Sequence, residues 1–257
     1  GNPCGTVARY CTGAEAQAKG SGSLKTVVTL SGIAGLGLAA YSLNQDPNGT
    51  SGTGPNGEVI WNWSGTHKCN PKKLHEPETL EELERIVADA HEQGKRLRPA
   101  GNALSPNGIA LSNEEMVSLR MMDKIVDIDS KRKQVTVEAG ISVGELCREL
   151  RSHGLTLQNL ASIAEQQVGG FLQVGAHGTG SSIPPVDQQV VRMKVVTPGR
   201  GTIEVSEQCN SEIFQLAKCG LGMFGVVSEV TLQCVDAHKL VEHTFTLSFD
   251  ELLKQHH

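Results

Sequence analysis

The chain has 257 residues, with 23 Lys and Arg against 28 Asp and Glu, and its net charge of -5 argues against a polybasic nucleic-acid-binding protein. Hydrophobic residues make up 38% and charged residues 20%, which is enough for a packed core and too few charges for a disordered acidic chain. The seven Cys form no CxxC pair and no Cys/His cluster with zinc spacing, so we expect neither a disulfide framework nor a metal site.

The N-terminal part of the chain differs in composition from the rest. We expect residues 1–25 to be a leader and residues 26–43, which carry no charged side chain, to form a transmembrane helix at the lower length limit for crossing a bilayer. Small residues recur there every four positions, as in closely packed transmembrane helices: Ser31, Gly35 and Ala39. A buried Gly-rich helix or the apolar part of a signal peptide is the alternative. Residues 44–58, rich in Gly, Pro and Asn, are expected to be a linker.

Strand and helix patterns begin after this linker. Val59–Trp63 alternates apolar and polar residues and predicts a strand, with its two tryptophans packed at the strand edge. Pro77–Thr79 opens a predicted helix, and Gly94 ends it. Its apolar stripe consists of Leu80, Leu83, Ile86, Val87 and Ala90. Arg96–Arg98 predicts a short strand that runs into a loop, Pro99–Ser112.

The middle of the chain predicts a hairpin and a second helix. The hairpin joins Lys124–Asp129 to Gln134–Ala139 across a polar turn. Ser142, followed by Glu145 three residues later, predicts a capped helix that ends at Gly154.

The last third of the chain predicts further strands and one short helix. Val190–Thr197 and Thr202–Val205 form the pattern of a strand pair. A short helix is expected at Ser211–Cys219, a long strand at Gly225–Val235 and the beginning of another strand at Lys239–Phe249. This order of elements predicts an α+β fold with at least one β-α-β unit.

Glycine is abundant, at 29 residues, and is concentrated in three stretches: residues 98–108, 162–180 and 219–227. Small residues at strand ends let successive backbone N–H groups converge on an anion, so we expect a nucleotide-binding site with bare backbone against a flat ligand, although each stretch alone also fits an ordinary turn. None contains a P-loop or a GxGxxG fingerprint. His177, in the second stretch, can serve as a base or as a structural hydrogen-bonding residue.

Taken together, in this order and spacing, the three stretches resemble the FAD-binding domain of the vanillyl-alcohol-oxidase (PCMH-type) flavoproteins, and within that family the aldonolactone branch. The residues that carry the resemblance are Leu104–Gly108, Gly154–Ile163, Val174–Gly180 and Thr231–Val235. The similarity extends from about Trp61 to about Thr246. It implies a PCMH-type FAD-binding domain of two α/β subdomains at residues 59–238, followed at residues 239–257 by the start of a truncated cap domain.

The resemblance also assigns residues to the cofactor. The first loop is expected to wrap the FAD diphosphate with the backbone of Ala100, Gly101, Asn102, Ala103, Leu104 and Ser105. Many relatives carry a flavin-linking His at the position of Leu104, so the resemblance implies non-covalent FAD. Ala161 corresponds to the residue that keeps oxygen from the reduced flavin. The remaining expected contacts are Ser162, Gln167, Gly170, Val174, Gly175, Ala176 and His177, with Val226 on the adenine side. Catalytic residues are expected from the cap domain and none within these 257 residues.

The implied activity is the oxidation of L-galactono-1,4-lactone to L-ascorbate with cytochrome c as electron acceptor. The plant members of this branch also take part in assembling the membrane arm of respiratory complex I. A catalytically silent scaffold for that assembly is therefore an alternative, as is a soluble flavoprotein with a transit leader. Lys19 and Lys25 precede the apolar segment and, by the positive-inside rule, would place the domain in the mitochondrial intermembrane space, anchored to the inner membrane.

Overall fold

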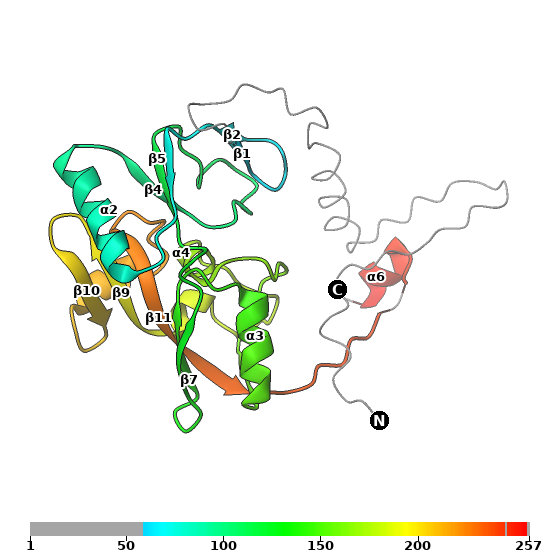
Figure 1. Cartoon of the computed structure of the whole chain (residues 1–257). Helices are drawn as coiled ribbons and strands as arrows, with labels where there is room; N and C mark the ends of the chain where they lie inside the picture. The colour runs from blue at the N-terminus through cyan, green and yellow to red at the C-terminus, as the bar shows by residue number, and fades with distance from the viewer. Residues whose placement is uncertain (1–58, 245, 256–257) are drawn as a thin grey trace.

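The computed structural model describes residues 59–244 and 246–255. The strands form two principal sheets, one parallel and one antiparallel, and a small two-stranded sheet lies beside the parallel one (Figure 1). One principal sheet is parallel, in the order β3-β5-β4, and the other is antiparallel, in the order β10-β9-β11-β7-β6, with β8 also paired to β11. The expected division into two α/β subdomains corresponds to these two sheets.

The parallel sheet contains the predicted β-α-β unit. It consists of β3 (Lys73–His75), α2 (Leu80–Glu92), β4 (Leu97–Ala100) and β5 (Glu115–Ser118). Thr79 caps α2, since its hydroxyl accepts a hydrogen bond from Glu82 N at 3.2 Å, and Gly94 follows the helix with φ +61°. The predicted ends of this helix are confirmed.

The antiparallel sheet confirms the predicted hairpin and strand pair. The hairpin is β6 (Ile125–Asp129) with β7 (Gln134–Glu138), and the pair is β9 (Val190–Thr197) with β10 (Gly201–Ser206). The long strand β11 (Val226–Asp236) lies between β9 and β7 and also pairs with β8 (Leu155–Leu157). The second predicted helix is α3 (Val143–Ser152), in which Ser142 accepts from Glu145 N at 3.1 Å.

One hydrophobic core joins the two subdomains. Helix α2 packs between the sheets, with Leu83 and Val87 buried in the same cluster as Val195 of β9. The contact is reinforced by Glu84, whose carboxylate accepts from Thr202 N at 3.2 Å and from the Thr202 hydroxyl at 2.5 Å. The subdomains therefore fold around shared apolar contacts.

Several short elements differ from the predictions. The predicted strand Val59–Trp63 is reduced to β1 (Ile60–Trp61), which pairs with β2 (Lys68–Cys69). A turn begins at Asn62, whose carbonyl oxygen accepts from Gly65 N at 2.9 Å. The second Gly-rich stretch contains a helix, α4 (Val168–Gln173), where bare, non-helical backbone is expected. Burial of Phe171 and Leu172 in the core compensates for the two glycines of this helix. The other short elements are η1 (Val186–Gln189) and α5 (Ser211–Ala217).

The predicted strand Lys239–Phe249 is wrong. The described residues from 237 to 248 contain neither strand nor helix, and α6 (Phe249–Gln255) follows. Leu240 and Val241 are 84% and 78% exposed, so no neighbouring strand supplies the hydrogen bonds that a strand requires.

The predicted leader, transmembrane helix and linker lie outside the described residues. Within residues 59–244 and 246–255, no helix combines the length and the apolar character needed to span a membrane.

Candidate functional site

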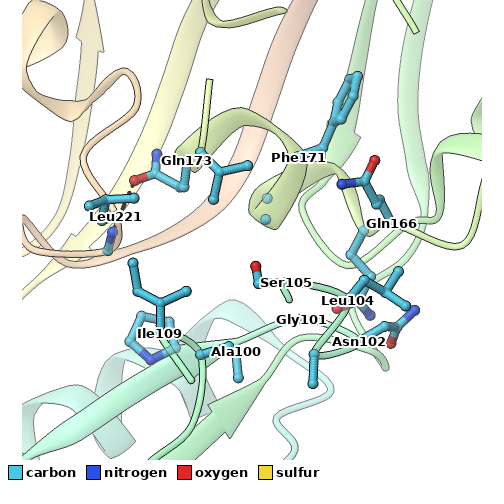
Figure 2. Close-up of a pocket in the computed structure, with 18 of the residues that line it drawn as sticks. Ala100, Gly101, Asn102, Leu104, Ser105, Ile109, Gln166, Phe171, Gln173 and Leu221 are labelled. Carbon is cyan, nitrogen blue, oxygen red and sulfur yellow. Dashed lines mark hydrogen bonds between the residues drawn. The ribbon is translucent and has the colours of Figure 1, made fainter. Parts of the chain in front are cut away.

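The three Gly-rich stretches meet around one cavity of about 670 Å³, a volume typical of ligand sites. The loop after β4 forms one wall and α4 the opposite wall (Figure 2). Leu221 and Gln173 lie at one end of the cavity, and Gln166, Leu104 and Asn102 lie at the other. The start of β11 completes the lining.

The loop after β4 presents backbone N–H groups without protein acceptors. In the described part of the chain, no hydrogen bond uses the N–H groups of residues 101–105 as donors. Ala103 has φ +51°, a left-handed conformation that is rare outside glycine and that helps neighbouring N–H groups converge. Its carbonyl oxygen instead faces the β1–β2 hairpin and accepts from Trp63 N at 3.0 Å.

Helix α4 is fixed by backbone contacts at its first turn. Val168 N donates to Ile141 O at 2.9 Å, and Gly169 N donates to Ala139 O at 2.8 Å. Gly170 follows and lines the cavity, where a Cβ on this residue would meet no atom within 4 Å. The helix therefore leaves open space where a ligand can approach its backbone.

Gln173, the last residue of α4, holds the third Gly-rich stretch in place. Its amide donates to Ala217 O at 2.9 Å and accepts from Gly222 N at 3.1 Å (Figure 2). Gly225, with φ +139°, directly precedes β11 and lies so close to β9 that a Cβ would be 2.2 Å from Val196 O. This glycine is required by packing.

The cavity is free of carboxylates although the chain is acidic. Among the described lining residues the only ionisable side chains are Arg98 and His177. Burial, followed by the like charge of Arg96, lowers the pKa of Arg98. One Arg98 amino group donates to Ile109 O, whereas its buried Nε has no partner. A bound anion would stabilise such a partly desolvated cation by pairing with its charge.

Gln166 adds an unpaired acceptor to the same cavity. Its Oε1 is buried and has no hydrogen-bond partner in the described structure. The free N–H groups, the unpaired guanidinium nitrogen, this carbonyl oxygen and the apolar walls together suit an elongated anionic ligand with polar-edged rings. A dinucleotide such as FAD fits this set of groups.

The predicted cofactor residues are brought together with one exception. Ser162 does not line the cavity, whereas the others do: Ala100, Gly101, Asn102, Ala103, Leu104, Ser105, Ala161, Gln167, Gly170, Val174, Gly175, Ala176, His177 and Val226. His177 Nδ1 lies 2.8 Å from Gly178 O, a contact that fits its structural hydrogen-bonding interpretation. The roles of all these residues in binding the cofactor stay predictions.

The lining also includes residues that are not among the expected cofactor contacts, and those with polar or aromatic side chains include Trp63, Arg98, Gln166 and Gln173. Trp63 is interpreted from the sequence only as part of a strand edge. The two glutamines are long polar side chains within a stretch of small and apolar residues, and this contrast is the signal that could have identified them.

The chain resembles known proteins over most of the described region. The model of a family described as FAD binding domain matches residues 71–206. The chain is 57% identical to L-galactono-1,4-lactone dehydrogenase 2, mitochondrial, of Oryza sativa subsp. japonica, covering 77% of this chain and 34% of that protein. It is 54% identical to the Arabidopsis thaliana L-galactono-1,4-lactone dehydrogenase, mitochondrial, covering 77% and 32%.

More distant similarities agree with this pattern. The chain is 37% identical to L-gulonolactone oxidase of Bos taurus, covering 78% of this chain and 46% of that protein. Among solved structures, an alkyldihydroxyacetonephosphate synthase has a TM-score of 0.57 and 23% identity, covering 66% of this chain and 32% of that chain; this likeness concerns the fold. The chain spans about a third of the length of the plant relatives.

Proposed function

Because the chain belongs to the FAD-binding domain family and FAD is its cofactor, we propose that residues 59–238 form the flavin-binding part of an aldonolactone dehydrogenase. The proposed reaction is the oxidation of L-galactono-1,4-lactone to L-ascorbate. The observation that carries the proposal is the cavity with unpaired loop N–H groups and no acidic lining residue. The names of the plant relatives support the substrate.

FAD, when bound, supplies a two-electron acceptor for hydrogen leaving a carbon that bears a hydroxyl group. The chain's own residues bind and orient that cofactor. The N–H groups of residues 101–105 would hold the diphosphate, and Arg98 would offset its negative charge. Val117, Leu119 and Phe171 line the cavity with apolar surface and would exclude water from the ring systems.

The test of turnover is flavin bleaching. Because the catalytic residues are expected in a cap domain, the test uses the protein isolated from its natural source. Anaerobic addition of L-galactono-1,4-lactone to that protein with bound FAD should remove the flavin absorbance near its visible maximum, and oxidised cytochrome c should restore it. Bound flavin that the lactone leaves oxidised would contradict the dehydrogenase proposal and favour the catalytically silent scaffold.

Leu104 underlies the proposal that FAD is held without a covalent bond. An alkyl side chain offers no nucleophile to the flavin methyl group, and Leu104 lines the cavity beside Gln166 and Asn102 (Figure 2). Acid precipitation should therefore release all of the flavin into the supernatant, as measured by its absorbance. Flavin retained in the washed precipitate would contradict this account.

Ala161 is the proposed oxygen gatekeeper. It lines the cavity and packs against the core, so its methyl group can narrow the access of a small gas to the ring. Ala161→Gly should speed reoxidation of the lactone-reduced protein by oxygen in stopped-flow measurements, with cytochrome c reduction retained. Unchanged oxygen reactivity, with FAD still bound, would remove this role.

The cellular setting is proposed from the same resemblance. Mitochondrial location follows from the names of the plant relatives. We place the protein at the inner membrane, with its domain in the intermembrane space, where cytochrome c and the membrane arm of complex I are candidate partners. Native electrophoresis of mitochondrial membranes should find the chain in a complex I subcomplex, and its absence from every such complex would contradict that association.

A further inference from the structure

The turn of the β1–β2 hairpin is organised around one buried side chain. Asn62 is 1% exposed. Its Nδ2 donates to the Ser64 hydroxyl at 2.9 Å and to the Thr66 hydroxyl at 3.1 Å, while its Oδ1 accepts from His67 N at 3.0 Å. These contacts close the turn upon itself.

The same side chain reaches the loop after β4. Asn62 Nδ2 also donates to Ser105 O at 3.2 Å, across 43 residues of sequence. Trp63 N holds Ala103 O at 3.0 Å, and the Thr66 hydroxyl donates to Pro106 O at 3.2 Å. The hairpin thus binds three carbonyl oxygens of the loop.

These contacts fix the orientation of peptide groups in the loop. The described chain contains no cis peptide bond, and in a trans peptide the carbonyl and the following N–H point in opposite directions. Holding Ala103 O and Pro106 O at the hairpin therefore directs the N–H groups of Leu104 and Asn107 toward the other side. Both of these residues line the cavity, and neither N–H donates a hydrogen bond within the described chain. The peptide of Ser105 O has no N–H because Pro106 follows, so the contact from Asn62 fixes the position of the loop and not a donor.

We propose that Asn62 is a positioning residue for the cofactor: it orders the hairpin turn and holds it against Ser105 O, so that Trp63 N and the Thr66 hydroxyl can fix the two peptides whose N–H groups face the diphosphate. The inference rests on the proposed function of the cavity. Asn62 and the hairpin turn precede residues 71–206, the part matched by the family model, so that match assigns them no role.

Asn62→Asp weakens the hold of the hairpin on the loop. Aspartate can accept hydrogen bonds from the Ser64 hydroxyl and from His67 N, which preserves the turn. The Thr66 hydroxyl has a single proton, so donating it to this carboxylate would release Pro106 O. Aspartate also cannot donate to Ser105 O and places negative charge beside that oxygen. We expect the dissociation constant for FAD to rise by about tenfold, the size expected when a buried carbonyl loses its donor, as measured by fluorescence titration of the apoprotein.

Three further measurements keep the test decisive. The bound FAD of Asn62→Asp should show shifted ³¹P resonances, because the diphosphate would meet a displaced loop. Thr66→Val removes the donor to Pro106 O and one acceptor of Asn62 Nδ2 but leaves the contact to Ser105 O. It should weaken FAD binding less, and it covers the case in which the buried aspartate unfolds the protein. Lys68→Ala is the matched control. Lys68 Nζ lies 4.9 Å from the centre of the Trp61 ring on the same hairpin, and its removal should leave FAD binding unchanged.

The outcomes separate this inference from the proposed function. Wild-type protein that fails to bind FAD contradicts the cavity assignment itself. Wild-type binding together with unchanged affinity in Asn62→Asp and Thr66→Val overturns the role of Asn62. Weaker binding with unchanged ³¹P resonances, or an equal effect of Lys68→Ala, reduces that role to general support of the hairpin and also overturns the inference.

Discussion

Gly169 and Gly170 are neighbours in α4 whose surroundings give them different tasks. A Cβ on Gly169 would lie 3.1 Å from Ala139 Cβ and 3.2 Å from Ala139 O, so this glycine allows the helix to pack against the end of β7. A Cβ on Gly170 would meet nothing within 4 Å. Close packing explains why residue 169 is a glycine, whereas Gly170 borders the open space of the cavity.

Gly170→Leu tests this distinction. The free energy of unfolding of the apoprotein should stay unchanged or rise by up to about 1 kcal/mol, because leucine favours a helix more than glycine does. FAD binding should weaken by about tenfold or more (about 1.4 kcal/mol), because the new side chain occupies the cavity. Urea unfolding and FAD titration measure the two effects.

The neighbouring substitution supplies the control. Gly169→Ala should lower the stability of the apoprotein by about 1 kcal/mol or more through overpacking against Ala139. If Gly170→Leu bound FAD as tightly as the wild type, the cofactor would have to lie elsewhere.

At the scale of the elements, length decides what the sequence reveals. Helices α2 and α3 can be predicted because Thr79 and Ser142 cap apolar stripes several turns long. Strands β3 and β5 have three and four residues, too few to establish a periodicity, and their pairing depends on partners far along the chain. Helix α4 is not predicted from the sequence because its glycines disfavour a helix. Burial of Phe171 and Leu172 in the core overrides that preference.

The candidate site divides in the same way. Its backbone segments can be located from three Gly-rich stretches and a family resemblance. The roles of Gln166 and Gln173 cannot be predicted from the sequence. They depend on which atoms the fold leaves unpaired and on contacts such as that of Gln173 with Gly222, 49 residues away.

Strand β5 carries an ionic cluster with a predictable pH response. Glu115 Oε1 lies 2.7 Å from Lys95 Nζ, and Glu115 Oε2 lies 2.8 Å from His75 Nε2. The hydrogen bond from Lys95, and then that from His75, holds the pKa of Glu115 below its ordinary value of 4.5. A lowered folded-state pKa stabilises the fold above the unfolded-state pKa, and this contribution is lost as the pH falls through the folded-state value.

Glu115→Gln should therefore lower the free energy of unfolding by about 1–2 kcal/mol at pH 7. The difference from the wild type should be smaller at pH 3 than at pH 7, because lowering the pH toward the folded-state pKa protonates a growing fraction of the wild-type carboxyl. Urea unfolding at the two pH values measures it. Glu114→Gln is the control: its carboxylate is 48% exposed and, among the residues that the structure describes, its ion pair is with Lys72 on the surface. A small effect at both pH values is therefore expected. Equal losses in the two variants would contradict the account.

At the scale of the whole molecule, the cavity lies where the two subdomains meet. The loop after β4 comes from the parallel sheet, and the first residues of β11 come from the antiparallel sheet, joined by α4 and one shared core. The lining extends from Trp63 to Val227, so the site exists only in the folded chain. FAD should consequently stabilise the fold in proportion to RT ln(1 + [FAD]/Kd).

The most direct measurement of the central claim is a crystal structure of the chain grown with FAD. The account predicts one FAD in this cavity, with diphosphate oxygens about 3 Å from the N–H groups of residues 101–105 and no covalent density to Leu104. Density for FAD at another surface, or a diphosphate that faces away from this loop, would contradict it.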